Sequence, residues 1–222
     1  MSKTPFDRRG APAWAFPAYL AGFFIAWTTY VLWVFPLVHN LGEASFSYAI
    51  AGDAARLVLW IAPVLLYLRC FDDTDILDAL GLRKNWRRGV VFGVAASLLL
   101  FTATALRHGF SNFDADRLTW NLLLSTSVIG VFEEVPFRGF ILQKVSRTTN
   151  FWFANTLTSM IFVAFHLPGW LSLGLFEWQN AEVVFVLSFL FGALYRYSGS
   201  LIAPIVAHSA YDVIAILLSG HR

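Results

Sequence analysis

Residues 10–42 read GAPAWAFPAYLAGFFIAWTTYVLWVFPLVHNLG and contain no Asp, Glu, Lys or Arg. A helix needs about 20 apolar residues to cross a bilayer, so this run is long enough for a complete span. A secretory signal would have a shorter apolar core of about 7–15 residues. We therefore interpret the run as a retained transmembrane helix that follows the basic residues Lys3, Arg8 and Arg9.

The composition of the whole chain agrees with a membrane environment. Of its 222 residues, 58% are hydrophobic and 14% are charged, and the mean hydropathy is +0.62. A soluble domain usually carries about 25% charged residues. Lipid is therefore the expected surrounding for most of the surface. The net charge of +2 gives no indication of a nucleic-acid partner.

The apolar runs predict helices. Only helices and closed barrels satisfy every backbone group in lipid, and barrel strands would alternate apolar and polar residues over about 10 residues. The runs here are long and unbroken, which predicts an all-α polytopic transmembrane bundle formed as a single membrane domain by residues 1–222. We expect seven spans, with six or eight left open, at approximately 13–37, 46–69, 89–106, 118–143, 151–167, 181–197 and 200–219.

The distribution of basic residues predicts the orientation. Loops on the cytoplasmic side of a membrane carry an excess of Lys and Arg. With a cytoplasmic N-terminus, eleven basic residues fall on that side and three on the other, which predicts a multi-pass protein of the plasma membrane with its N-terminus inside. The eleven are Lys3, Arg8, Arg9, Arg69, Arg83, Lys84, Arg87, Arg88, Lys144, Arg147 and Arg196, and the three are Arg107, Arg117 and Arg222.

Several polar residues lie inside predicted spans, where a charge costs at least about 2.5–3.5 kcal/mol. In the fourth span, Glu134 and Arg138 are four residues apart and can pair on one helix face. Glu133 is then left without a cation on its own helix, which makes it a candidate general base. In the second span, Asp53 and Arg56 are three apart, and we interpret them as a structural pair.

Two later spans carry histidines. Phe162 and His166 share a helix face, and the Pro-Gly pair that follows is predicted to end the helix directly after the histidine. His208 and Asp212 are four apart and face the same way. At a rise of about 1.5 Å per residue, Glu133, His208 and Asp212 reach similar depths. His166 comes out deeper, unless its helix tilts or starts earlier.

Three motifs in this order, Glu-Glu-x-x-x-Arg, Phe-x-x-x-His and His-x-x-x-Asn/Asp, resemble those of the CPBP family. These are the CAAX-processing and bacteriocin-processing membrane peptidases, also called Rce1-like or Abi. The resemblance covers roughly residues 118–220, which it marks as a CPBP-like catalytic core. It implies an intramembrane endopeptidase that acts on a peptide or protein associated with the lipid bilayer.

The resemblance also implies roles for six residues. Glu133 with His166 would activate the attacking water, and His208 with Asp212 would stabilise the oxyanion of the tetrahedral intermediate. Glu134 and Arg138 would hold the site together. Asn is common in the CAAX-processing branch at the position of Asp212, and Asp can donate a hydrogen bond only when it is protonated.

Metal use and catalysis itself remain open in the sequence. Members of this family are often labelled metallopeptidases, and a divalent metal such as zinc would find its candidate ligands in Glu133, His166 and His208. No His-Glu-x-x-His motif is present, and a metal-free glutamate mechanism is equally consistent. Two alternatives to a peptidase are a non-enzymatic immunity or scaffold protein of the same family and a transporter, although internal repeats typical of transporters are lacking.

Overall fold

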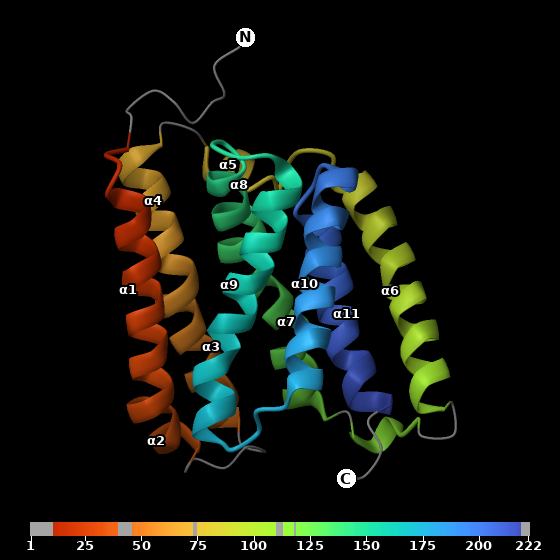
Figure 1. Cartoon of the computed structure of the whole chain (residues 1–222). Helices are drawn as coiled ribbons and strands as arrows, with labels where there is room; N and C mark the ends of the chain where they lie inside the picture. Colours follow the sequence, from red (N-terminus) through yellow and green to blue (C-terminus); the bar gives the residue numbers. More distant parts are fainter. Residues whose placement is uncertain (1–10, 40–45, 73–74, 110–112, 118, 219–222) are drawn as a thin grey trace.

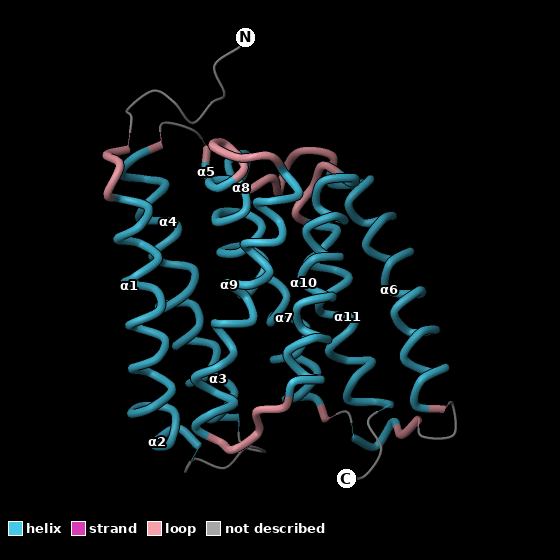
Figure 2. Tube along the Cα trace, in the orientation of Figure 1, coloured by secondary structure: helices cyan, strands magenta, loops and turns pink. Residues whose placement is uncertain are grey.

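The chain forms a bundle of helices that run roughly along one axis (Figure 1). The computed structural model describes residues 11–39, 46–72, 75–109, 113–117 and 119–218. Within these ranges there is no strand, and short loops join the helices (Figure 2). The predicted all-α polytopic bundle is therefore confirmed. The basic residues Lys3, Arg8 and Arg9 lie outside the described residues.

Seven helical stretches correspond to the seven ranges expected from the apolar runs. Three of them contain a π-helical segment, labelled η1, η2 and η5, and η4 is a turn of 3-10 helix. The elements are α1 (Ala15–Thr29), η1 (Tyr30–Val34), α2 (Phe35–His39), α3 (Phe46–Arg56), η2 (Leu57–Ile61), α4 (Ala62–Phe71), α5 (Ile76–Ala79), α6 (Trp86–His108), η4 (Ala115–Arg117), α7 (Trp120–Glu134), η5 (Val135–Ile141), α8 (Leu142–Val145), α9 (Phe151–Ser172), α10 (Trp178–Ser198) and α11 (Ile202–Leu218).

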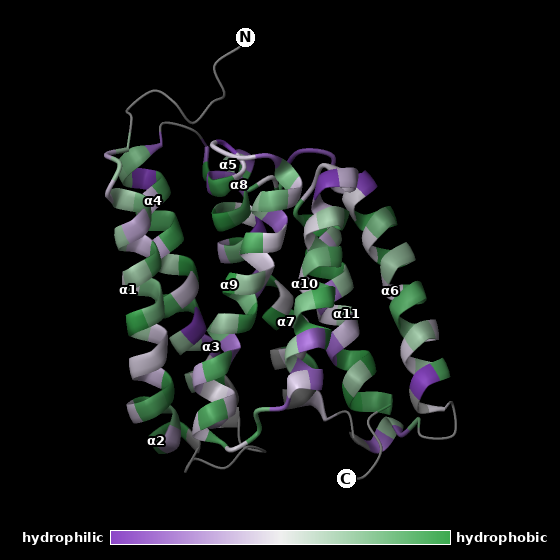
Figure 3. Ribbon diagram, viewed as in Figure 1, coloured by the Kyte–Doolittle hydropathy of each residue, from purple (hydrophilic) through white to green (hydrophobic). Residues whose placement is uncertain are grey.

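Five of these stretches are long and apolar enough to cross a membrane. They are Ala15–Val38, Ile50–Phe71, Trp86–Arg107, Phe151–Ser172 and Trp178–Ser198, and Ile202–Leu218 is a shorter apolar helix. The helix bodies are largely apolar and most polar residues gather at the two ends (Figure 3). On α6, Leu98, Leu99 and Leu106 are each more than 60% exposed, at 63%, 73% and 73%. Such an apolar outer surface suits lipid rather than water, so the chain is a multi-pass membrane protein.

The helix that carries His166 differs from the expectation. Pro168 and Gly169 were predicted to end it directly after the histidine, but α9 continues through both residues to Ser172. The prediction was wrong because a proline is tolerated within a transmembrane helix when neighbouring groups satisfy the carbonyls that it leaves free. His166 therefore lies inside a continuous helix rather than at its end.

Close helix packing positions the segments that carry the polar motifs. α11 packs against both α6 and α7, and α10 packs against α9 and α11. A Cβ atom on Gly130 of α7 would lie 2.8 Å from the carbonyl oxygen of Ile205 on α11, so glycine permits this approach. Away from these helices, Arg56 Nη1 lies 2.8 Å from Asp53 Oδ1, which confirms the predicted structural pair.

Candidate active site

The Glu-Glu-x-x-x-Arg motif lies where the α-helix of α7 changes to the π-helical segment η5. Glu134 is the last residue of α7, and Pro136 stands near the start of η5. Proline has no N–H for the preceding turn and crowds it, and a wider turn accommodates this. Every residue of η5 is buried. π-helical turns are frequent at functional sites, and this one holds the motif in the interior of the bundle.

Glu134 and Arg138 form a completely buried ion pair. Arg138 Nη1 donates to Glu134 Oε1 over 2.8 Å, and both side chains are 0% exposed. Arg138 Nη2 donates to the backbone oxygen of Ser188 over 2.7 Å and to its Oγ over 2.8 Å. The predicted pairing of Glu134 with Arg138 is confirmed, and it ties η5 to α10.

His208 on α11 connects this ion pair to the other two carboxylates. Its Nδ1 lies 2.7 Å from Glu134 Oε1. Its Nε2 lies 3.6 Å from Glu133 Oε2 and 3.8 Å from Asp212 Oδ2. A carboxylate only accepts hydrogen bonds, so Nδ1 donates to Glu134 and Nε2 is the nitrogen that faces Glu133 and Asp212. The expectation that His208 and Asp212 face the same way is confirmed.

His166 on α9 is oriented by its own helix. Its Nδ1 lies 2.8 Å from the carbonyl oxygen of Phe162, and the two rings are 4.8 Å apart, so the predicted shared face is confirmed. A carbonyl oxygen accepts, so Nδ1 carries the hydrogen in this bond. In the neutral ring, Nε2 is then the nitrogen with a free lone pair.

A cavity of about 110 Å³ brings the two histidines and the two outer carboxylates together. It is lined by Glu133, Phe162, His166, Val184, Leu187, Phe191, His208, Tyr211 and Asp212. The sequence predicted that His166 lies deeper in the membrane than Glu133. The structure nevertheless places both residues on the same cavity. α9 begins at Phe151 as expected and crosses the bundle obliquely (Figure 1), which supports tilt as the reason. Glu134 and Arg138 lie behind this cavity instead of lining it.

Comparison with known proteins identifies the part of the chain that contains this cavity. Residues 115–214 match the family model described as type II CAAX prenyl endopeptidase Rce1-like. This segment resembles the Rce1-like family. The resemblance inferred from the three motifs is thereby confirmed, and the family indicates a protease.

One relative of known sequence aligns with most of the chain. It is the uncharacterized protein YyaK of Bacillus subtilis (strain 168), which is 27% identical over 196 residues. The alignment covers 80% of this chain and 60% of the relative, so the chain spans less than two thirds of the relative's length. No solved structure matches the chain.

The candidate metal ligands are not gathered closely in this structure. Among the residues that the structure describes, no group of three or more His, Cys, Asp or Glu side chains could hold a metal ion. Glu133, His166 and His208, the candidate ligands, are therefore not close enough together in this structure to hold one metal ion.

The sequence analysis missed two residues of α10 that shape the site. Ser188 binds Arg138 through both its hydroxyl and its carbonyl. The ring of Phe191 stacks on His208 at a centroid distance of 4.9 Å and lies 5.7 Å from the Arg138 guanidinium. The sequence did contain an indication that α10 packs closely against another helix. Ser188 and Gly192 are two small residues four apart, a pattern that is typical of close helix contacts.

The cavity combines proton acceptors with hydrogen-bond donors that suit an oxyanion. A cavity of about 110 Å³ has room for a few water molecules. Glu133 and the free Nε2 of His166 can accept protons there. Nε2 of His208 and a protonated Asp212 can donate hydrogen bonds. Acceptors and donors of this kind are those that peptide hydrolysis requires.

Proposed function

We propose that this protein is an intramembrane endopeptidase that hydrolyses a peptide bond of a membrane-associated protein or peptide. The observation that carries the proposal is the single cavity shared by Glu133, His166, His208 and Asp212 inside an apolar bundle. Ionisable residues within membrane spans are costly and mark function by default. The Rce1-like segment supports the same class of reaction.

In the first step, Glu133 removes a proton from a water molecule while the water oxygen attacks the scissile carbonyl carbon. His166 accepts a hydrogen bond from the same water through Nε2 and orients it, because its Nδ1 is occupied by the Phe162 carbonyl. A positioned base of this kind contributes about 10²–10⁴-fold to the rate.

In the second step, the carbonyl oxygen becomes an oxyanion that accepts hydrogen bonds from His208 and Asp212. His208 can donate from Nε2 while Nδ1 stays bonded to Glu134 only if both ring nitrogens carry a proton. Asp212 lies 3.8 Å from that Nε2 and donates in its protonated form. The proton held by Glu133 then passes to the amide nitrogen, and the C–N bond breaks to give a carboxylic acid and an amine.

Glu134 and Arg138 do not line the cavity and act on the substrate only through His208. Glu134 Oε1 accepts from His208 Nδ1 over 2.7 Å and from Arg138 Nη1 over 2.8 Å. The carboxylate therefore fixes the direction of the His208 ring and stabilises its doubly protonated form, and Arg138 neutralises the buried carboxylate. Groups that orient a catalytic histidine in this way are part of the catalytic arrangement without touching the substrate.

Variants of Asp212 test the oxyanion role. We expect Asp212→Ala to lower turnover by about 10²–10³-fold, which is the cost of removing one oxyanion donor. Asp212→Asn should stay active, because the amide N–H donates at every pH. Its activity should also persist to a higher pH than that of the wild type, until His208 loses its second ring proton. An inactive Asp212→Asn enzyme, measured by turnover against pH, would show that the carboxyl group has another role.

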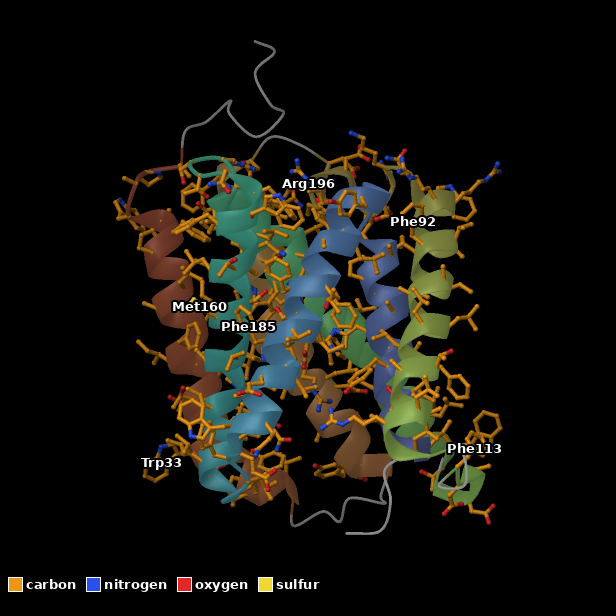
Figure 4. All side chains as sticks on the ribbon, turned by 45° about the vertical axis from the view of Figure 1, so that its right-hand side comes forward. Trp33, Phe92, Phe113, Met160, Phe185 and Arg196 are labelled. Atoms are coloured by element: carbon orange, nitrogen blue, oxygen red, sulfur yellow. The ribbon has the colours of Figure 1, made fainter. Side chains whose placement is uncertain are left out.

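The described basic residues support a cytoplasmic N-terminus and a plasma-membrane location. Lys144 in α8 and Arg196 near the end of α10 lie at the end of the bundle where α1 begins (Figures 1 and 4). Cytoplasmic loops carry such an excess. The substrate is then a peptide or protein that reaches the site within the bilayer, next to lipid.

The experiment that tests the function compares membrane-associated peptides in cells that express the wild-type protein or Glu133→Gln. We expect fragments with new termini in the wild-type membranes, and accumulation of their intact precursors with the variant. The non-enzymatic alternative predicts identical peptide profiles and an unchanged biological phenotype in both strains. That result would overturn the peptidase proposal.

A further inference from the structure

Trp27 of α1 contacts α9 in the turn that carries His166. Its indole Nε1 donates to the carbonyl oxygen of Phe165 over 2.9 Å. This carbonyl belongs to the residue directly before His166. The indole N–H therefore ties the backbone of α9 to α1 beside the histidine.

The ring of Trp27 also holds the Phe165 side chain. The two rings stack at a centroid distance of 4.9 Å with planes 14° apart. Phe23, one turn earlier on α1, stacks on the same ring at 5.0 Å, and Trp60 of η2 meets it edge-on at 4.9 Å. Phe165 is 2% exposed. Aromatic pairs of this geometry contribute about 0.5–1.5 kcal/mol each beyond burial, so the residue next to His166 is firmly held by the N-terminal helices.

The position of His166 in the bundle depends on contacts between α9 and other helices. The hydrogen bond from its Nδ1 goes to Phe162 in the same helix, so it fixes the ring relative to α9 only. The distance between His166 and Glu133 on α7 depends on where α9 lies in the bundle. Trp27 binds the backbone immediately before His166, and it does so from a helix outside the Rce1-like segment 115–214.

We propose that Trp27 is a positioning residue for His166, holding the turn before Pro168 so that the imidazole reaches the cavity beside Glu133. The inference rests on the proposed peptidase function for its kinetic consequence. In this proposal α1 contributes to the reaction by positioning His166. The Rce1-like segment alone would lack the indole N–H of Trp27 that does so.

The test uses purified full-length protein and the substrate found in the membrane-peptide comparison. Trp27→Phe keeps an aromatic ring and removes the indole N–H. We expect kcat to fall about tenfold, since small misplacements of a catalytic group cost up to about 10²-fold, with KM unchanged. Trp33→Phe is the matched control, because Trp33 lies on the same helical stretch but is 73% exposed and points away from the bundle (Figure 4). Its kcat should equal that of the wild type.

A second variant separates positioning from general loss of structure. His166→Ala removes the imidazole that Trp27 is proposed to place, so only the residual turnover that does not depend on His166 remains. In that background, Trp27→Phe should lower kcat by less than about threefold, which is a coupling that independent sites do not show. Equal losses in both backgrounds, or no loss from Trp27→Phe alone, would overturn the proposal.

A readout without turnover keeps this proposal distinct from the peptidase function. The imidazole ¹⁵N signals of His166, assigned with a His166→Gln sample, should shift in Trp27→Phe and stay in place in Trp33→Phe. If the wild-type protein cleaves no peptide but the signals shift, the peptidase function fails and the positioning contact stands. If the signals do not move, the positioning proposal fails whether or not the protein is a peptidase.

Discussion

Replacing Glu133 with Gln should lower kcat by about 10²–10⁴-fold, the usual contribution of a positioned general base. The change keeps the shape of the side chain and removes its ability to take a proton. Glu133 lines the cavity with His166, and its Oε2 lies 3.6 Å from His208 Nε2. The loss should appear in kcat more than in KM, because the carboxylate acts on the water. The measurement is single-turnover cleavage of the identified substrate by purified protein in lipid.

The matched control is Glu182→Gln, the same substitution on an exposed residue of α10. It should leave both kcat and the free energy of unfolding unchanged. A Glu133→Gln protein that cleaves at the wild-type rate would remove Glu133 from the role of base. The other acceptor in the cavity, His166, would then be the candidate to replace it.

Replacing Arg138 with Met should lower the free energy of unfolding by about 3–5 kcal/mol, which is typical when one partner of a buried ion pair is removed. Glu134 would remain 0% exposed with its charge no longer neutralised by the guanidinium. The hydroxyl and carbonyl of Ser188 would also lose their donor. Denaturant titration of the protein in detergent micelles measures this change.

Two further variants make the Arg138 result specific. Adding Glu134→Gln to Arg138→Met should recover most of the lost stability, because neutral groups then replace both members of the pair. Arg83→Met is the control for loss of an exposed ion pair, since Arg83 Nη1 lies 3.2 Å from Asp75 with both side chains about half exposed. It should cost about 0–1 kcal/mol. Equal costs for Arg138→Met and Arg83→Met would contradict the structural role of the buried pair.

The two adjacent glutamates illustrate how environment divides roles between identical side chains. Glu134 is completely buried, and its Oε1 accepts from both Arg138 and His208, so this oxygen is not available to a substrate. Glu133 turns to the cavity, where its 3.6 Å separation from His208 leaves it open to a water molecule. Carboxylates whose surroundings differ in this way commonly take different parts in one reaction.

Much of the fold could be predicted from local patterns. The uncharged run at 10–42 predicted the first span, and helices cover the seven expected ranges because backbone groups in lipid must bond within their own segment. Spacings of four residues predicted the Glu134–Arg138 pair and the shared face of His208 and Asp212, since such residues are neighbours on a helix. The end of α9 was misplaced because a proline within a transmembrane helix does not have to end it.

By itself, the sequence determined that the chain is a helical membrane protein and which polar residues share a helix face. These properties depend on composition and on patterns that repeat every few residues. Only the tertiary structure decided which faces meet. It placed His166 in one cavity with Glu133, bonded Glu134 to His208 across 74 residues of chain, and recruited Ser188 and Trp27. The physical reason is that helix tilt and the close approaches allowed by small residues such as Gly130 arise from packing between distant segments.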